Sequence, residues 1–197
     1  MDPEEKLLKE IQGEDHAQYP AWRWFVLLAF AMNCGGNSFM FMDFTTVPDL
    51  TKQVFGYCPF EGDCIQTNSD SGDSFVGWTY SASLLAVLPA AFPVFMYLDK
   101  KNWITSGVGM FCNFLGGWLR YASVEQARNG NYAHARTVAL TSSIFIGFAA
   151  AVIICSYSAI PSRWFPESER TLATTFAVQS NYAGWCVGCI LFPYVVV

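Results

Sequence analysis

Five long apolar stretches dominate this chain and restrict it to a small set of folds. They cover residues 22–47, 75–98, 103–121, 138–160 and 172–197. A transmembrane α-helix needs about 20 apolar residues, because it rises ~1.5 Å per residue through a hydrocarbon core of ~30 Å. Each stretch is about that long, and few ionised side chains interrupt any of them. We therefore expect an all-α, polytopic membrane protein with about five transmembrane helices.

The charged residues lie mostly outside these stretches. Only 14% of the residues are charged, against roughly 25% in an average soluble domain. Eleven of the sixteen acids fall in residues 1–15 and 49–73. We therefore divide the chain into a polar N-terminal tail (1–21) and a transmembrane domain (22–197) that contains an exterior loop (48–74). No basic patch suited to nucleic acid is present.

Lysine and arginine set the expected orientation, because cytosolic loops of membrane proteins carry an excess of both. Seven of the eleven cations fall on the side of the N-terminus if five spans alternate: Lys6, Lys9, Arg23, Lys100, Lys101, Arg163 and Arg170. The N-terminus is therefore predicted to be cytosolic. Both the plasma membrane and an organelle membrane fit this pattern.

Two cysteines, Cys58 and Cys64, lie in the predicted exterior loop. An oxidising compartment permits a disulfide there, and the intervening residues include a proline and a glycine that help the chain to turn back. Spacing does not establish the geometry that a disulfide needs, so two free thiols fit the sequence as well.

A second cysteine pair, Cys186 and Cys189, has the spacing of a redox or metal motif. No second pair or nearby histidine completes a tetrahedral metal site. Gly184 and Gly188 form a Gly-x-x-x-Gly face in the same segment, which favours close helix packing. The sequence also has no phosphate-binding glycine loop or serine elbow, so we expect neither a cofactor nor an enzyme.

The segment between the last two stretches carries the sharpest local signal. Pro161 is expected to end or bend the preceding helix, and Pro166 fits the start of the next one. Acids in the first turn of that helix interact favourably with the helix dipole, and nearby arginines can pair with them. This arrangement either anchors two helix ends or forms a cytosolic latch. The candidate latch residues are Asp99, Lys100, Arg163, Glu167, Glu169 and Arg170.

One acid, Asp43, lies within an apolar stretch. A carboxylate inside a membrane is costly and usually faces a cavity or a partner, so Asp43 is a candidate for substrate charge or proton coupling. It is also only five residues before Pro48, so an interfacial position fits as well. Amide side chains in or near the spans more often tie helices together than bind substrate, and they are Asn33, Asn37, Asn113, Gln179 and Asn181.

The segment Arg163-Trp-Phe-Pro-Glu-Ser-Glu-Arg170 followed by Ala173-Thr-Thr resembles the start of the fifth helix in major facilitator superfamily transporters. The turn 98–101 is similar to that superfamily's loop between helices two and three, although its usual glycines are missing. Segments 115–121, 161–170, 181–184 and 192–193 narrow the resemblance to the feline leukaemia virus subgroup C receptor-related family and its relative known as disrupted in renal carcinoma.

This resemblance implies a helical transporter fold in which two six-helix halves enclose the substrate. It also implies alternating access and small organic solutes such as choline, with haem and vitamins also attributed to the family. Phe41 stands where the family pattern has a tryptophan, and Tyr182 where it has a glutamine. Both rings can still offer cation–π contacts. With Asn37 and Asn181, whose helices the resemblance places around the central cavity, and with Asp43, they form the predicted substrate site.

Two functions follow from these observations. In the first, the chain is the N-terminal part of a major facilitator transporter for a small organic solute. In the second, it is a non-transporting structural subunit that uses a half-transporter fold within a larger membrane complex. The expected partners are the lipid bilayer, a missing C-terminal half or other membrane subunits, and a small organic solute.

Overall fold

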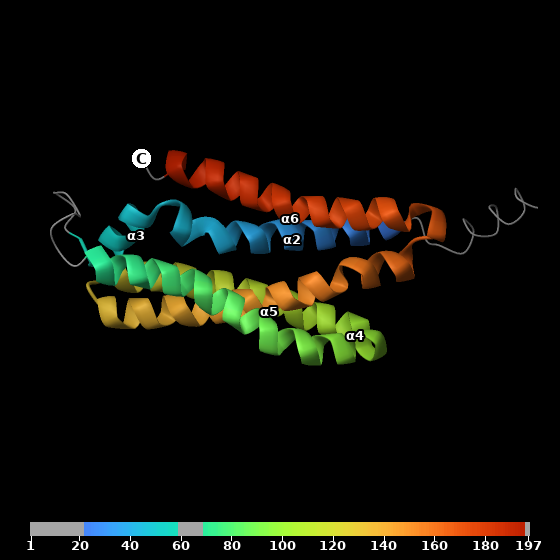
Figure 1. Cartoon of the computed structure of the whole chain (residues 1–197), viewed down its shortest axis with the longest axis horizontal. Coiled ribbons are helices and arrows are strands. Elements are labelled where there is room, and N and C mark those ends of the chain that lie inside the picture. Colours follow the sequence, from blue (N-terminus) through green and yellow to red (C-terminus); the bar gives the residue numbers. More distant parts are fainter. Residues whose placement is uncertain (1–21, 59–68, 196–197) are drawn as a thin grey trace, which may run out of the picture.

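The computed structural model describes residues 22–58 and 69–195, and leaves the side chains of 69, 98–102 and 193–195 undescribed. The described part is entirely helical, as the sequence predicts. It contains α2 (Arg23–Thr46), α3 (Pro48–Val54), α4 (Ser69–Arg128), α5 (Tyr132–Trp164) and α6 (Glu167–Val195). The long helices run along one axis (Figure 1). The predicted tail 1–21 and the centre of the exterior loop lie outside the described residues.

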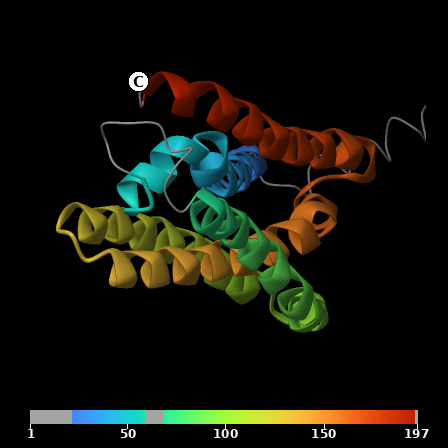
Figure 2. The same cartoon turned by 60° about the vertical axis from the view of Figure 1, so that its left-hand side comes forward.

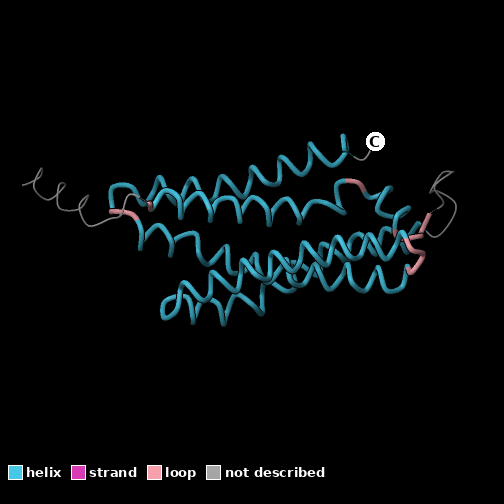
Figure 3. Tube along the Cα trace, turned by 180° about the vertical axis from the view of Figure 1, so that it is seen from behind, coloured by secondary structure: helices cyan, strands magenta, loops and turns pink. Residues whose placement is uncertain are grey.

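Helix α4 contains 60 residues and folds back on itself. Figures 1 and 3 show its first half running to one end of the bundle and its second half returning. Both halves pack on α5 at the same level, since Gly147 lies against Ser83 and its neighbour Ile146 lies against Gly116. The expected spans 75–98 and 103–121 correspond to these two halves. The helical backbone nevertheless continues through the reversal, because no glycine or proline interrupts it between Pro93 and Gly107.

Three helical segments of the described chain are long and apolar enough to cross a membrane: Arg23–Thr46, Asp70–Tyr97 and Tyr132–Trp164. The second half of α4 and helix α6 lie beside them but are less apolar (Figure 1). Asn113 interrupts the first of these, and Gln179 and Asn181 interrupt the second. The structure is therefore that of a helical, integral membrane protein.

Helix α2 lies between α6 and the α4–α5 pair (Figure 2). Glycines set the distance to α6, because a Cβ at Gly184 would collide with the backbone of Gly35. A Cβ at Gly188 would lie only 3.3 Å from Cβ of Met42. The predicted Gly-x-x-x-Gly packing face is thus confirmed, whereas Cys186 and Cys189 are exposed on other sides of α6.

A buried lysine fixes the α3 end of the bundle. Lys52 Nζ lies 2.8 Å from Asp49 Oδ1 and 3.0 Å from Asp73 Oδ1, so it ties α3 to the start of α4. The hydrogen bond to Asp49, followed by that to Asp73, raises the pKa of Lys52 above its ordinary value. Phe55 packs behind this cluster against Phe75, with ring centroids 5.0 Å apart. These contacts hold the described parts of the predicted exterior loop on the bundle.

Candidate functional site

A cavity of about 320 Å³ lies between α2, the first half of α4, α5 and α6. Small-molecule sites commonly begin near ~300 Å³, so this volume suits a small ligand. Its lining combines five aromatic residues, three of them tyrosines, with two asparagines and one serine, and contains no ionisable acid or base other than tyrosine. These polar and aromatic residues are Asn37, Ser38, Phe41, Tyr80, Tyr157, Asn181, Tyr182 and Trp185.

Four of the five predicted substrate residues therefore meet at one cavity: Asn37, Phe41, Asn181 and Tyr182. The first two lie on α2 and the last two on α6, far apart in the sequence. The close packing of α2 on α6 brings them together. The rings form edge contacts, with Tyr182 and Trp185 centroids 5.9 Å apart at 90°. The planes of these two rings are therefore perpendicular.

The amides on the cavity wall also hold the helices in place. Asn37 Nδ2 donates to Asn113 Oδ1 at 2.9 Å and to the carbonyl oxygen of Ile146 at 3.1 Å. Asn113 Nδ2 in turn donates to Asn33 Oδ1 at 2.8 Å. This chain of bonds joins α2, α4 and α5 and confirms the interpretation of Asn33 and Asn113 as helix ties. Both Nδ2 hydrogens of Asn37 are used, so its Oδ1 is the atom that remains for a ligand.

Asn181, on α6, forms its hydrogen bond with α2. Ser38 Oγ donates a hydrogen bond to Asn181 Oδ1, which links α2 to α6. Because its oxygen accepts this bond, Asn181 has its Nδ2 hydrogens left as donors at the cavity. The cavity therefore offers both a donor and an acceptor beside its aromatic rings.

Asp43, the fifth predicted residue, does not line this cavity. Its Oδ1 pairs with Arg120 Nη1, on the second half of α4. Arg120 Nη2 donates to Ser143 Oγ of α5 at 3.3 Å, and the guanidinium lies 4.3 Å from the centroid of the Phe44 ring. The side chains of Arg120 and Asp43 are only 8% and 17% exposed. The carboxylate is thus neutralised by a buried arginine that joins three helices.

Several predicted latch residues lie at the α5–α6 turn. One of them, Glu169, has an ion-pair partner that the sequence analysis did not identify. Glu169 pairs with Arg23 at the start of α2, with Arg23 Nη2 and Glu169 Oε2 2.9 Å apart. Arg170 Nη1 lies 3.4 Å from Glu167 Oε1, and its Nε donates to the carbonyl oxygen of Phe165 at 3.1 Å.

The other latch and disulfide predictions depend on residues that the structure describes only in part. The side chains of Asp99 and Lys100 lie outside the described residues, so their part in the latch stays a prediction. Cys64 also lies outside them, and the Cys58–Cys64 disulfide stays a prediction for that reason.

The curated proteins similar to this chain that are named below are all choline/ethanolamine transporters. Choline/ethanolamine transporter FLVCR1 of Felis catus is 27% identical over 177 residues, which are 89% of this chain and 28% of the relative. Choline/ethanolamine transporter FLVCR2 is 25% identical over 175 residues in both Rattus norvegicus and Homo sapiens, covering 88% of this chain and 28% or 29% of those proteins. The chain resembles the feline leukaemia virus subgroup C receptor-related transporters. No protein-family model matches it.

The chain spans less than a third of the length of these FLVCR relatives. They are transporters and not enzymes, which agrees with the lack of an enzyme motif in the sequence. Their membrane setting and the apolar helices described above together support an integral membrane protein in a lipid bilayer.

Proposed function

We propose that this chain is the N-terminal part of a major facilitator transporter that moves a small organic solute across a membrane by alternating access. The observation that carries the proposal is the cavity of about 320 Å³, in which aromatic rings and two amides from α2 and α6 meet. The resemblance to choline/ethanolamine transporters gives the solute class, a small organic cation with a hydroxyl group.

The cavity chemistry suits such a solute. An ammonium group over the face of an aromatic ring gains about 0.5–2 kcal/mol, depending on how far it is desolvated. Tyr182, Trp185 and Phe41 supply such rings, and none of the residues around the cavity is a lysine or arginine that would repel the cation. The amide groups of Asn37 and Asn181 then serve the hydroxyl end of the solute.

Five membrane crossings follow from the proposal: α2, the two halves of α4, α5 and α6. This topology puts α3 and the α4–α5 turn on one side, and the α5–α6 turn on the other, which agrees with their positions at opposite ends of the bundle (Figure 1). With a cytosolic N-terminus, α3 faces the exterior and the latch residues face the cytosol. Opening of the Arg23–Glu169 contact would then accompany one of the two access states.

We propose that Asp43 acts through its ion-pair partner, Arg120. A proton or a cationic solute that reaches Asp43 has to displace Arg120 from the carboxylate. Release of Arg120 would loosen the contact between α2 and the second half of α4, so the proposed role of Asp43 is coupling and not direct solute contact.

The test is uptake of labelled choline and ethanolamine into cells that express the full-length protein containing this chain. We expect uptake above that of control cells and a clear loss in Tyr182→Leu. Tyr97→Leu is the matched control, because Tyr97 is 62% exposed and lies away from the cavity. A correctly inserted protein that gives no uptake of either solute would refute the proposal and favour a structural subunit.

A further inference from the structure

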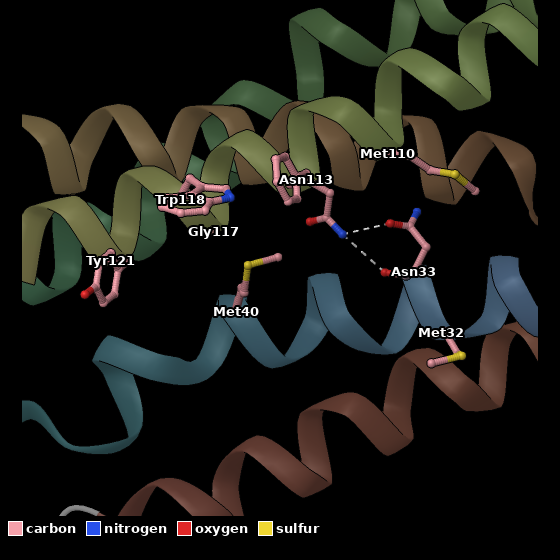
Figure 4. A pocket seen from close by; sticks show the side chains of 9 residues that line it. Met32, Asn33, Met40, Met110, Asn113, Gly117, Trp118 and Tyr121 are labelled. Atoms are coloured by element: carbon pink, nitrogen blue, oxygen red, sulfur yellow. Dashed lines mark hydrogen bonds between the residues drawn. The ribbon is translucent and has the colours of Figure 1, made fainter.

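An asparagine outside the cavity, Asn113, is hydrogen-bonded to an asparagine in its wall. Asn113 lies on the second half of α4 and lines a separate hollow between that segment and α2 (Figure 4). It is buried and is not among the residues around the cavity. Its Oδ1 nevertheless accepts a hydrogen bond of 2.9 Å from Nδ2 of Asn37, which does line the cavity. Asn113 can therefore act on a bound solute through Asn37 without touching it.

Backbone groups fix the direction of each bond in this chain of amides. A backbone carbonyl oxygen accepts hydrogen bonds and cannot donate one. The carbonyl oxygen of Ile146 therefore requires Nδ2 of Asn37, and not its Oδ1, at 3.1 Å. At the other end, Nδ2 of Asn113 faces the carbonyl oxygen of Asn33 at 3.4 Å and its Oδ1 at 2.8 Å (Figure 4). A reversed amide at Asn37 or Asn113 would place two oxygens or two N–H groups against each other.

These bonds decide which atom Asn37 presents to the cavity. Its Nδ2 carries two hydrogens, and Asn113 Oδ1 and the carbonyl oxygen of Ile146 each accept one. Oδ1 of Asn37 accepts no hydrogen bond from the described residues, so it is left as an acceptor in the cavity wall. Without Asn113, one N–H of this buried side chain has no acceptor, which costs free energy, and a single bond to Ile146 no longer fixes the amide.

We propose that Asn113 is a positioning residue for the solute: it holds Asn37 with Oδ1 toward the cavity, where that oxygen accepts a hydrogen bond from the hydroxyl group of the solute. The role rests on the proposed function, in which the solute is a small organic cation with a hydroxyl group. It concerns selectivity more than affinity, because the aromatic rings attract the cationic end whatever the orientation of Asn37. A site that hydrogen-bonds a hydroxyl group discriminates against an analogue without one, since its polar groups are then left unpaired.

Binding of two matched cations to the purified full-length protein in lipid nanodiscs tests this role. Choline and trimethylpropylammonium share the trimethylammonium group, and a methyl group of the second replaces the hydroxyl group of the first. We expect the unaltered protein to prefer choline, and this preference to fall about 2- to 12-fold in Asn113→Leu, the equivalent of one neutral hydrogen bond. The Kd of trimethylpropylammonium should hardly change. Unfolded molecules lower the number of binding sites and not the ratio of the two Kd values, and Asn113→Ala is the second variant if Asn113→Leu does not fold.

Two further variants separate positioning from helix packing. Asn33→Leu removes the bonds between Asn33 and Asn113 but leaves Asn113 Oδ1 bonded to Asn37, so the preference for choline should remain. Asn113→Asp, in its neutral form, presents an oxygen to Asn37 and an O–H to Asn33 Oδ1, so it should also keep the preference. An unchanged preference in Asn113→Leu, or an equal loss in Asn33→Leu, would contradict the positioning role and leave the proposed function standing. Unaltered protein that binds neither cation would overturn both.

Discussion

Removing either partner of the Asp43–Arg120 pair should destabilise the bundle strongly. The two side chains are 17% and 8% exposed, so neither Arg120→Leu nor Asp43→Leu allows water to replace the lost partner fully. Breaking a buried ion pair by removing one partner costs about 3–5 kcal/mol, because the other charge remains buried and uncompensated. In Arg120→Leu, Asp43 Oδ1 keeps only the backbone N–H of Phe44, at 2.6 Å. In Asp43→Leu, Arg120 keeps Ser143 and the ring of Phe44.

Thermal unfolding of the purified protein in lipid nanodiscs measures the effect. A loss of 1 kcal/mol lowers the melting temperature by roughly 2–4 °C in a domain of this size, so each single variant should melt about 6–20 °C lower. The matched control is Arg128→Leu, whose partner Glu125 is 3.9 Å away and whose side chain is 73% exposed. Exposed pairs contribute about 0–1 kcal/mol, so this control should hardly change.

The double variant tests whether an uncompensated buried charge causes the loss of stability in the single variants. Asp43→Leu combined with Arg120→Leu removes both buried charges, so its loss of stability should be about 0.5–3 kcal/mol smaller than the sum of the two single losses. Single variants that melt with the unaltered protein, or a double variant whose losses simply add, would refute the reasoning.

Three further predictions concern the ends of the bundle and its helix packing. Arg23→Leu should lower the melting temperature by a few degrees, because it removes the partner of the half-buried Glu169, and Glu169→Gln should do the same. Gly184→Leu should abolish the folded state in a detergent stability assay, since its side chain collides with the backbone of α2, whereas Gly77→Leu meets nothing within 4 Å and should fold. The raised pKa of Lys52 means that its stabilisation is complete below the ordinary lysine value of ~10.4 and is lost as the pH rises through the folded value. Lys52→Met should therefore flatten the alkaline part of a melting-temperature profile against pH.

Much of the fold can be predicted from the sequence because the bilayer imposes a length on each apolar stretch. The predicted first span, 22–47, differs from α2 by one residue at each end. Helix α4 continues to Arg128, seven residues beyond the end of the predicted third span at residue 121. Hydrophobicity marks where a helix leaves the apolar layer, whereas helical hydrogen bonds continue into polar residues.

The family resemblance groups four residues into one expected substrate site, and binding of a solute there stays a prediction. Asn37, Phe41, Asn181 and Tyr182 line one cavity because their helices pack closely. The ion-pair partners were not predictable, since a pair 77 residues apart in sequence depends on which helices become neighbours. Arg120 lies near the end of the predicted span 103–121, and the continuation of α4 to Arg128 places it within the bundle beside Asp43.

Direct binding of choline to the purified full-length protein tests most directly whether this cavity holds the solute. Titration should give a single site in the unaltered protein. Tyr182→Leu should raise the Kd by about 2- to 30-fold, which corresponds to the ~0.5–2 kcal/mol of one cation–π contact. Tyr182→Phe should bind nearly as the unaltered protein does, because the ring face is kept. Equal affinities for Tyr182→Leu and the unaltered protein, both correctly folded, would show that the solute does not bind in this cavity.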